Sequence, residues 1–206
     1  MIQKILFLFL TLIASQLFAQ VNIPYKKSVE IASQHKKLAV LPPKVNIEIK
    51  DPSISEKIKE QEKIESLNFQ SSIIEFLTKK KNKKNLDIEI LTQDETNRIL
   101  KEKGIQSFSS ISYKELAELL EVDGILSSRF SMARPLTNAE ALLSSLVIGF
   151  SSSKTVSADI TLTDRGSGKA IWNFNWTNEG VFSKPEVLIE SLMKSAVVRI
   201  PYKSTK

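Results

Sequence analysis

The chain has 206 residues, of which 42% are hydrophobic and 25% are charged, and its formal net charge is +6. These values fit one ordinary globular domain with flanking segments. Cysteine is absent and histidine occurs once, so disulfides, thiolate metal sites, a lipidated cysteine and cysteine-based catalysis are excluded.

Residues 1–19 have the layout of a secretory signal peptide. Lys4 comes first, an apolar run follows at 5–13, and Ala19 precedes the expected cut. The apolar run is well short of the ~20 residues that a membrane-spanning helix needs. We therefore expect export to the periplasm, with association with the outer membrane left open. The remaining chain is moderately basic, which suits anionic lipid headgroups or acidic proteins, and export argues against nucleic acid as a partner.

Residues 20–36 show no apolar period and are interpreted as an N-terminal arm that precedes a single domain at 37–206. His35 lies in this arm, beside Lys36 and Lys37. A lone histidine with basic neighbours is a poor metal ligand or general base. The sequence thus indicates a solvated surface histidine.

The domain is expected to begin with a strand and a long helix. The apolar run 38–41 ends at two prolines, which predicts a buried strand that stops sharply. Alternation at 45–49 predicts a short extended segment or a loop lying on the core. Ser55 is expected to cap an amphipathic helix that ends at about Lys79. The apolar stripe of this helix is predicted to comprise Ile64, Leu67, Ile74 and Leu77, widened by Phe69, Ile73 and Phe76.

A basic run follows, with five lysines: Lys79, Lys80, Lys81, Lys83 and Lys84. Lysines at a helix C-terminus interact favourably with the helix dipole, so a solvated turn is one interpretation. Contact with an anionic membrane or a glycan is the other. Alternation at 86–91 then predicts the next strand.

Capping boxes mark the helix starts that follow. Thr92, Ser112, Thr137 and Ser183 are each followed three residues later by glutamate. In this motif the hydroxyl and the carboxylate satisfy backbone amides at a helix start. The first box predicts a helix that ends at Gly104, the second a helix over 113–121, and the fourth a last helix from 184 to about 199. Between the second and third boxes, an Asp-Gly turn leads to a strand in which Leu126, Phe130 and Met132 share one face and Arg129 lies on the other.

The third box opens an apolar insertion at 137–153. Its central part, 139–150, is apolar nearly all round, and a helix of that kind must be buried somewhere. It would be roughly 18 Å long, which is too short to cross a bilayer. A core helix, a contact helix for an oligomer or partner, and an interfacial membrane element are the three alternatives. The residues concerned are Leu142, Leu143, Leu146, Val147, Ile148 and Phe150.

Alternating residues at 156–176, interrupted by a polar loop with two glycines, predict an antiparallel hairpin. Trp172, Phe174 and Trp176 share its apolar face. Burial under a helix is the expected role of these rings, and a sugar-stacking platform is the alternative. The loop lacks phosphate-loop spacing and is followed by a strand, so we interpret it as a turn.

The predicted fold class is α/β (α+β), with a mixed sheet of about five strands covered by helices and a C-terminal hairpin followed by a final helix. With one histidine and no cysteine, neither a thiol nor a Ser-His-Asp site is plausible. We expect no enzymatic activity, no cofactor, no metal and no small-molecule substrate.

Three stretches, at 37–43, 122–126 and 160–172, resemble the CsgG-like and LpoB-like group of bacterial envelope proteins, whose fold is related to the TolB N-terminal domain. The resemblance implies a non-enzymatic protein, since members are secretion-pore subunits or outer-membrane lipoproteins that contact envelope enzymes. This chain departs from the pattern because it has no lipidated cysteine and because its apolar segment is too short for transmembrane hairpins.

The leading hypothesis is an exported protein that binds an envelope protein partner or itself through the apolar segment 139–150. The second hypothesis is peripheral membrane binding through this segment and the lysine run 79–84.

Overall fold

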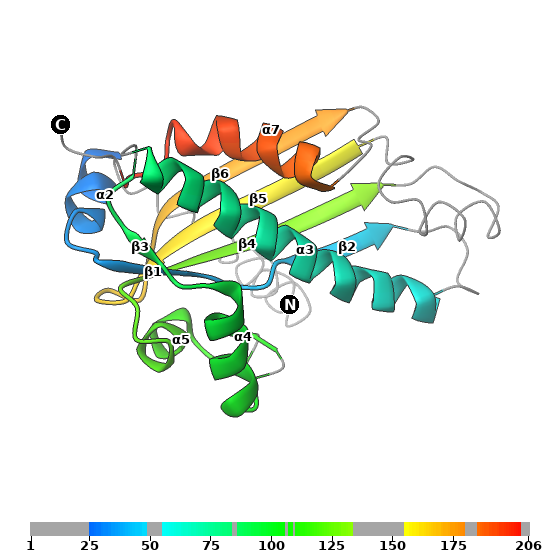
Figure 1. The fold of residues 1–206 in the computed structure, drawn as a ribbon, viewed down its shortest axis with the longest axis horizontal. Coiled ribbons are helices and arrows are strands. Elements are labelled where there is room, and N and C mark those ends of the chain that lie inside the picture. The colour runs from blue at the N-terminus through cyan, green and yellow to red at the C-terminus, as the bar shows by residue number, and fades with distance from the viewer. Residues whose placement is uncertain are drawn as a thin grey trace, which may run out of the picture.

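The computed structural model describes residues 25–48, 55–83, 86–105, 107–108, 110–133, 155–179 and 185–202. Within these residues a mixed sheet is packed between helices, which confirms the predicted α/β class (Figure 1). The elements are α2 (Tyr25–Ala32), β1 (Lys37–Val40), β2 (Lys44–Glu48), α3 (Ser55–Asn82), β3 (Glu89–Ile90), α4 (Gln93–Glu102), α5 (Tyr113–Leu119), β4 (Gly124–Ala133), β5 (Thr155–Asp164), β6 (Ala170–Glu179) and α7 (Pro185–Val197).

The strands lie in the order β3-β1-β4-β5-β6, and β2 also pairs with β4. Both β1 and β2 run parallel to β4, β1 beside its first residues and β2 beside its last. Pro42 and Pro43 separate β1 from β2 because proline has no N–H to donate to the ladder. The extended segment predicted after the prolines is therefore a strand of the sheet.

The predicted hairpin is confirmed. β4, β5 and β6 form successive antiparallel pairs, and the apolar residues of β5 are all buried. Gly168 closes the turn with a φ of 66°, which is a conformation that glycine adopts at little cost. A bulge near Leu162 alters the expected alternation in β6. It turns Ile171 into the core, although period two places Ile171 on the polar face.

Helices cover the two faces of the sheet unequally. α3 and α7 pack on one face, over the main core of β4, β5 and β6 (Figure 1). On the other face, α4 contacts β1 and α5 contacts β4 and β5, over a smaller apolar cluster. Beyond that cluster, the second face carries a polar row that crosses the strands through Arg129, Asp159 and Asn175, which are neighbours in register.

The apolar stripe predicted for α3 is confirmed for Phe69, Ile73 and Leu77, which are buried, but two of its residues lie outside the core. Ile64 and Leu67 are each 47% exposed, whereas Glu65 and Phe69 are buried. A four-residue repeat from Glu65 through Phe69 to Leu77 faces the sheet, and of its positions only Glu65 was not predicted. Glu65 is compatible with this face because its carboxylate accepts a hydrogen bond from Gln61. A search for apolar residues alone cannot find a buried face that contains polar positions.

Two of the predicted capping boxes are present. Thr92 and Ser112 each accept a hydrogen bond from the backbone N–H of the glutamate three residues on, and each glutamate accepts one in return. The hydrogen bonds from Thr92 and Ser112 lower the pKa of Glu95 and Glu115 below the usual value. The boxes at Thr137 and Ser183 begin outside the described residues.

Candidate interaction surfaces

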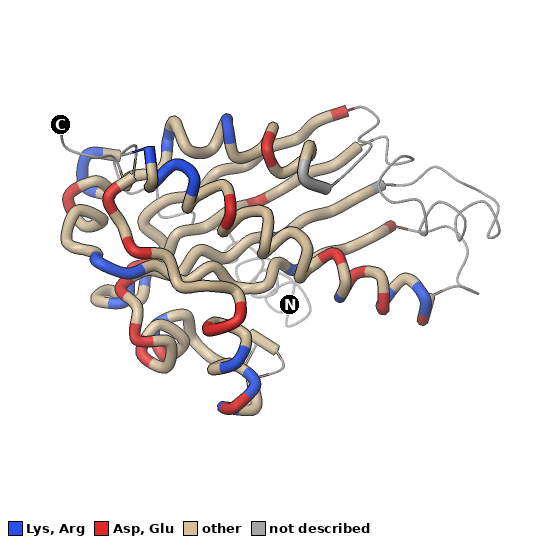
Figure 2. Tube along the Cα trace, in the orientation of Figure 1, with Lys and Arg blue, Asp and Glu red and all other residues tan. Residues whose placement is uncertain are grey.

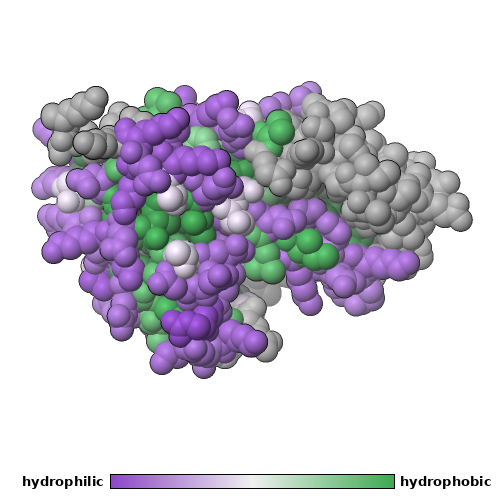
Figure 3. Space-filling model, viewed as in Figure 1, coloured by the Kyte–Doolittle hydropathy of each residue, from purple (hydrophilic) through white to green (hydrophobic). Residues whose placement is uncertain are grey.

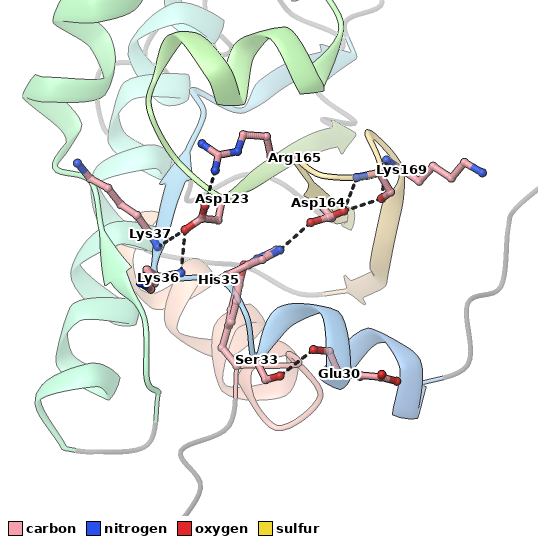
Figure 4. Close-up of polar contacts among 11 residues, drawn as sticks. Glu30, Ser33, His35, Lys36, Lys37, Asp123, Asp164, Arg165 and Lys169 are labelled. Carbon is pink, nitrogen blue, oxygen red and sulfur yellow. Dashed lines mark hydrogen bonds and ion pairs between the residues drawn. The ribbon is translucent and has the colours of Figure 1, made fainter.

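His35 is buried, which corrects the interpretation of this residue as a solvated histidine in an arm. α2 occupies residues 25–32, and the turn after it directs His35 to the end of the sheet where β4 begins and β5 ends. Only 7% of the residue is exposed. Its Nε2 lies 2.9 Å from Asp164 Oδ1 (Figure 4). Its Nδ1 lies 2.7 Å from the Tyr202 hydroxyl.

The proton positions follow from the neighbours. Burial disfavours the charged form of Asp164, but hydrogen bonds from Ser167 and His35 outweigh it and hold the pKa of Asp164 below its usual value. Burial, with two nearby carboxylates, raises the pKa of Tyr202 well above its usual value. An ionised Asp164 accepts a hydrogen bond from His35 Nε2, and a neutral Tyr202 has a proton to donate to Nδ1.

A second carboxylate lies beside this cluster. Asp123 Oδ2 accepts hydrogen bonds from the backbone N–H groups of Lys36 and Lys37, and its Oδ1 lies 2.9 Å from Arg165 Nη2 (Figure 4). Burial disfavours ionised Asp123, but these partners lower the pKa of its carboxyl below the usual value. The two aspartates thus connect the segment around His35 with the turn before β4 and the loop between β5 and β6.

This network is better suited to holding the fold together than to catalysis. Both ring nitrogens of His35 have partners, and Asp164 is only 8% exposed. Tyr202 and Asp164 are far from His35 in sequence, so no local motif indicates the cluster. Across the described segments, no group of three or more histidine, aspartate and glutamate side chains is placed to hold a metal ion.

The aromatic face of the hairpin lies mainly inside the protein. Trp172 and Phe174 are 8% and 5% exposed, and their rings stack 5.9 Å apart. Trp176 is partly buried and packs on the same core. Burial is therefore confirmed, and the sugar-stacking platform is wrong because the rings of Trp172 and Phe174 are not accessible.

The lysine run lies at the C-terminal end of α3, facing α7 (Figure 2). Lys79, Lys80 and Lys83 line a hollow of about 380 Å³ between the two helices, with Lys194 on the α7 side. Lys79 pairs with Glu75 at 2.6 Å, and Lys194 pairs with Glu190 at 2.9 Å. Lys84 lies outside the described residues. The hollow is thus lined by more lysines than carboxylates. Contact of the lysine run with a membrane or a glycan stays a prediction.

Residues 139–150 also lie outside the described residues, but the structure fixes where residues 134–154 begin and end. Ala133 at the end of β4 pairs with Thr155 at the start of β5. Glu48, the last residue of β2, also pairs with Ala133. α3 extends from this end of the sheet toward β3, and its 28 residues span about 42 Å (Figure 1). The described lysines of the run and the paired residues Ala133 and Thr155 therefore lie at opposite ends of α3.

A groove of about 940 Å³ was not foreseen from the sequence. It opens where the two prolines interrupt the strand, between α4, the α4–α5 connection and the polar face of the sheet. Its lining contains three cationic side chains and one carboxylate, but no histidine. The groove could therefore bind a charged group, but it lacks a histidine that could act as a general acid or base. The residues that define it include Pro43, Lys101, Phe108, Tyr113, Arg129 and Asp159.

On the face that carries α3 and α7, the described part of both helices has a mainly hydrophilic surface (Figure 3). Hydrophobic side chains are visible on this face between α3 and the region of α4 and α5. No helix among the described segments is both long and apolar enough to cross a membrane.

No known protein-family model matches the chain, and no curated protein matches it in sequence. Similar solved structures include lipoprotein GNA1162 from Neisseria meningitidis, with 14% identity and a TM-score of 0.47 over 80% of this chain and 97% of that chain. The PelC dodecamer from Paraburkholderia phytofirmans has 16% identity and a TM-score of 0.44 over 83% and 89%. The LpoB C-terminal domain from Escherichia coli has 10% identity and a TM-score of 0.35 over 79% and 100%.

An LpoB domain is thus among the similar structures, as the sequence resemblance suggested, but at low identity. Because all three TM-scores are below 0.5, the function of this chain has to be argued from its own residues.

Proposed function

We propose that this chain is an exported, non-catalytic protein of the bacterial envelope that binds another envelope protein through residues 139–150. Export is supported by the signal-peptide layout of residues 1–19. A non-catalytic role is supported by the use of the single histidine inside the fold, where both of its ring nitrogens have partners.

The observation that carries the proposal is the pairing of the two strand ends that flank residues 134–154. β4 and β5 pair in unbroken register from Gly124 with Asp164 to Ala133 with Thr155. Two residues are enough to join antiparallel strands at such a point, yet residues 134–154 are used. Connections longer than about 12–15 residues are uncommon in compact domains and are often functional. The length and the apolar composition of this segment are explained if it is a contact surface.

Peripheral membrane binding is the second candidate, since Lys79, Lys80 and Lys83 line one hollow with Lys194. A membrane that contacts both this hollow and the apolar segment has to extend along α3, which is about 42 Å long. The exposed side of α3 also carries glutamates, among them Glu56 and Glu75, which an anionic surface repels (Figure 2). Protein binding through the apolar segment alone has no such requirement.

A replacement experiment tests the proposal. Residues 139–150 are exchanged for a Gly-Ser linker of equal length, and the variant is compared with the wild type after export. We expect cooperative thermal unfolding to be retained and cross-linking to a second envelope protein to be lost. Loss of cooperative unfolding would show instead that the segment is part of the core.

Liposome flotation separates the two candidates. If the protein floats with anionic liposomes at low salt and not at high salt, the membrane alternative gains support. Replacement of Lys79, Lys80, Lys83 and Lys194 by glutamine should then abolish flotation. If binding is absent at both salt concentrations, the membrane alternative is wrong.

A further inference from the structure

Two cations lie side by side on the floor of the groove of about 940 Å³. Lys44 of β2 is the register partner of Arg129 of β4, and Asp159 of β5 is the partner of Arg129 on its other side. The next residues in β2 and β4, Val45 and Phe130, are buried in the main core. Because successive residues of a strand point to opposite faces, Lys44 and Arg129 lie on the face that the groove exposes.

The described residues do not neutralise these positive charges. Lys44, Arg129 and Lys101 of α4 are exposed, and none of them belongs to an ion pair within the described part of the chain. Asp159 also forms no ion pair there, although it lies opposite Arg129 in register. With three cationic side chains and one carboxylate, the lining has an excess of two positive charges. Like charges opposite each other on neighbouring strands destabilise a sheet, so an anion between Lys44 and Arg129 would remove this repulsion.

The rest of the lining suits a ligand with rings and hydroxyl groups. Phe108 and Tyr113 contribute aromatic rings on the side of α5, and Tyr113 is 37% exposed. On the floor, the Thr161 hydroxyl donates its proton to the Asn173 side chain and keeps lone pairs that can accept from a ligand hydroxyl. The Asp159 carboxylate is a second acceptor. Sugars combine apolar ring faces with hydroxyl groups, so this lining fits them.

We propose that the groove binds an acidic oligosaccharide, with a sugar carboxylate held between Lys44 and Arg129. A guanidinium matches a carboxylate with two parallel hydrogen bonds, and Lys101 supplies a second charge from the helix side. Small-molecule sites have volumes of roughly 300–1,000 Å³, so a groove of about 940 Å³ suits a ligand of several rings. This inference goes beyond the proposed function, because it uses described side chains and not residues 139–150.

An acidic peptide is the other anionic occupant, and the floor of the groove disfavours it. Extended peptides gain affinity by pairing their main chain with the exposed edge of a strand. β4 pairs with β5 on one side and with β1 and β2 on the other, so the groove lies over a sheet face and not over an edge. Asp159 also repels a second carboxylate placed close to the first, whereas it accepts hydrogen bonds from sugar hydroxyls. Carboxylates separated by neutral sugars avoid this repulsion.

Isothermal titration calorimetry of the exported chain with a hyaluronan tetrasaccharide tests the proposal. This probe alternates two acidic sugars with two neutral ones, so its charge matches the excess of two positive charges in the lining. We expect one binding site per chain. Arg129→Gln should weaken binding by about tenfold or more, because it removes hydrogen bonds between charged groups. Lys101→Gln, on the helix side of the groove, should weaken it as well.

Arg98→Gln is the matched control, since Arg98 lies on the same helix as Lys101, pairs with Glu102 and is not part of the lining. It makes the same charge change as Arg129→Gln and should leave the binding constant unchanged. A neutral tetramer of N-acetylglucosamine should bind about tenfold more weakly than the acidic probe or not at all, because it lacks the carboxylates.

Three results would overturn the proposal. They are no binding of the hyaluronan tetrasaccharide, equal effects of Arg129→Gln and Arg98→Gln, and equally tight binding of a peptide that alternates glutamate with serine. Exchange of residues 139–150 for a Gly-Ser linker should leave the titration unchanged. Failure of sugar binding is therefore distinguishable from failure of the partner-binding function at residues 139–150.

Discussion

Gly124 shows how closely the buried cluster is packed. A Cβ at this position would lie 2.5 Å from the Tyr202 hydroxyl and 3.0 Å from His35 Nδ1. We expect Gly124→Ala to lower the free energy of unfolding by about 1–3 kcal/mol, because the hydrogen-bonded pair has to move. Urea denaturation measures this loss.

Gly166→Ala is the control for that substitution. Its Cβ would come no closer than 3.4 Å to a neighbouring heavy atom outside its adjacent residues, and its φ is not positive. Stability should change by less than about 0.5 kcal/mol. Equal losses in the two variants would mean that the His35–Tyr202 contact does not constrain Gly124.

The same cluster predicts a pH dependence. Because the pKa of Asp164 is lower in the folded chain than in the unfolded chain, its ionised form stabilises the fold. This contribution is fully present above the unfolded pKa of about 3.9 and is lost as the pH falls through the folded value. Asp164→Asn should cost about 1–3 kcal/mol at neutral pH and make the acid loss of stability shallower.

Denaturant unfolding at a series of pH values checks the Asp164 prediction. Asp159→Asn is a suitable control because Asp159 is exposed on the polar face of the sheet. It should reproduce the wild-type profile. An Asp164→Asn profile as steep as that of the wild type would contradict the assigned role of Asp164.

At the scale of the elements, α3 gives a direct test of which helix face is buried. Phe69 is fully buried and its ring centroid lies 4.4 Å from that of Phe130, so Phe69→Ala should cost about 3–5 kcal/mol. Ile64→Ser and Leu67→Ser should each change stability by less than about 0.5 kcal/mol, because both side chains are half exposed. Large losses at Ile64 and Leu67, measured by thermal unfolding, would mean that these two residues belong to the buried face, as the apolar spacing predicts.

The elements that could be predicted from the sequence are those with strong local signals. Alternation marks β4, β5 and β6, and capping boxes mark the starts of α4 and α5. Features that depend on distant partners could not be predicted. His35 is buried by Asp164 and Tyr202, which are 129 and 167 residues away, and the groove forms only when α4 and the sheet come together.

In the candidate site, too, features with a local sequence signal could be predicted and features that depend on distant residues could not. The lysine run was predicted as a basic surface, and its position at the end of α3 agrees with the expected helix. Its association with Lys194 of α7 has no counterpart in the local sequence. The residues of the apolar segment were chosen from composition alone, and their role as a contact stays a prediction.

At the scale of the whole molecule, the sheet separates the surfaces proposed for binding. Residues 134–154 join the ends of β4 and β5 at one end of the sheet, and the His35 cluster closes the opposite end of β5. The groove lies between these two ends, because Arg129 and Asp159 pair midway along β4 and β5.

Site-specific photo-cross-linking in living cells tests the partner-binding role most directly. The photoreactive residue is placed at position 146 in the apolar segment or at position 59, where Lys59 is exposed near the start of α3. We predict that position 146 gives a discrete product containing a second envelope protein and that position 59 gives none. A product formed equally at both positions, or no protein product at position 146, would contradict the proposed function.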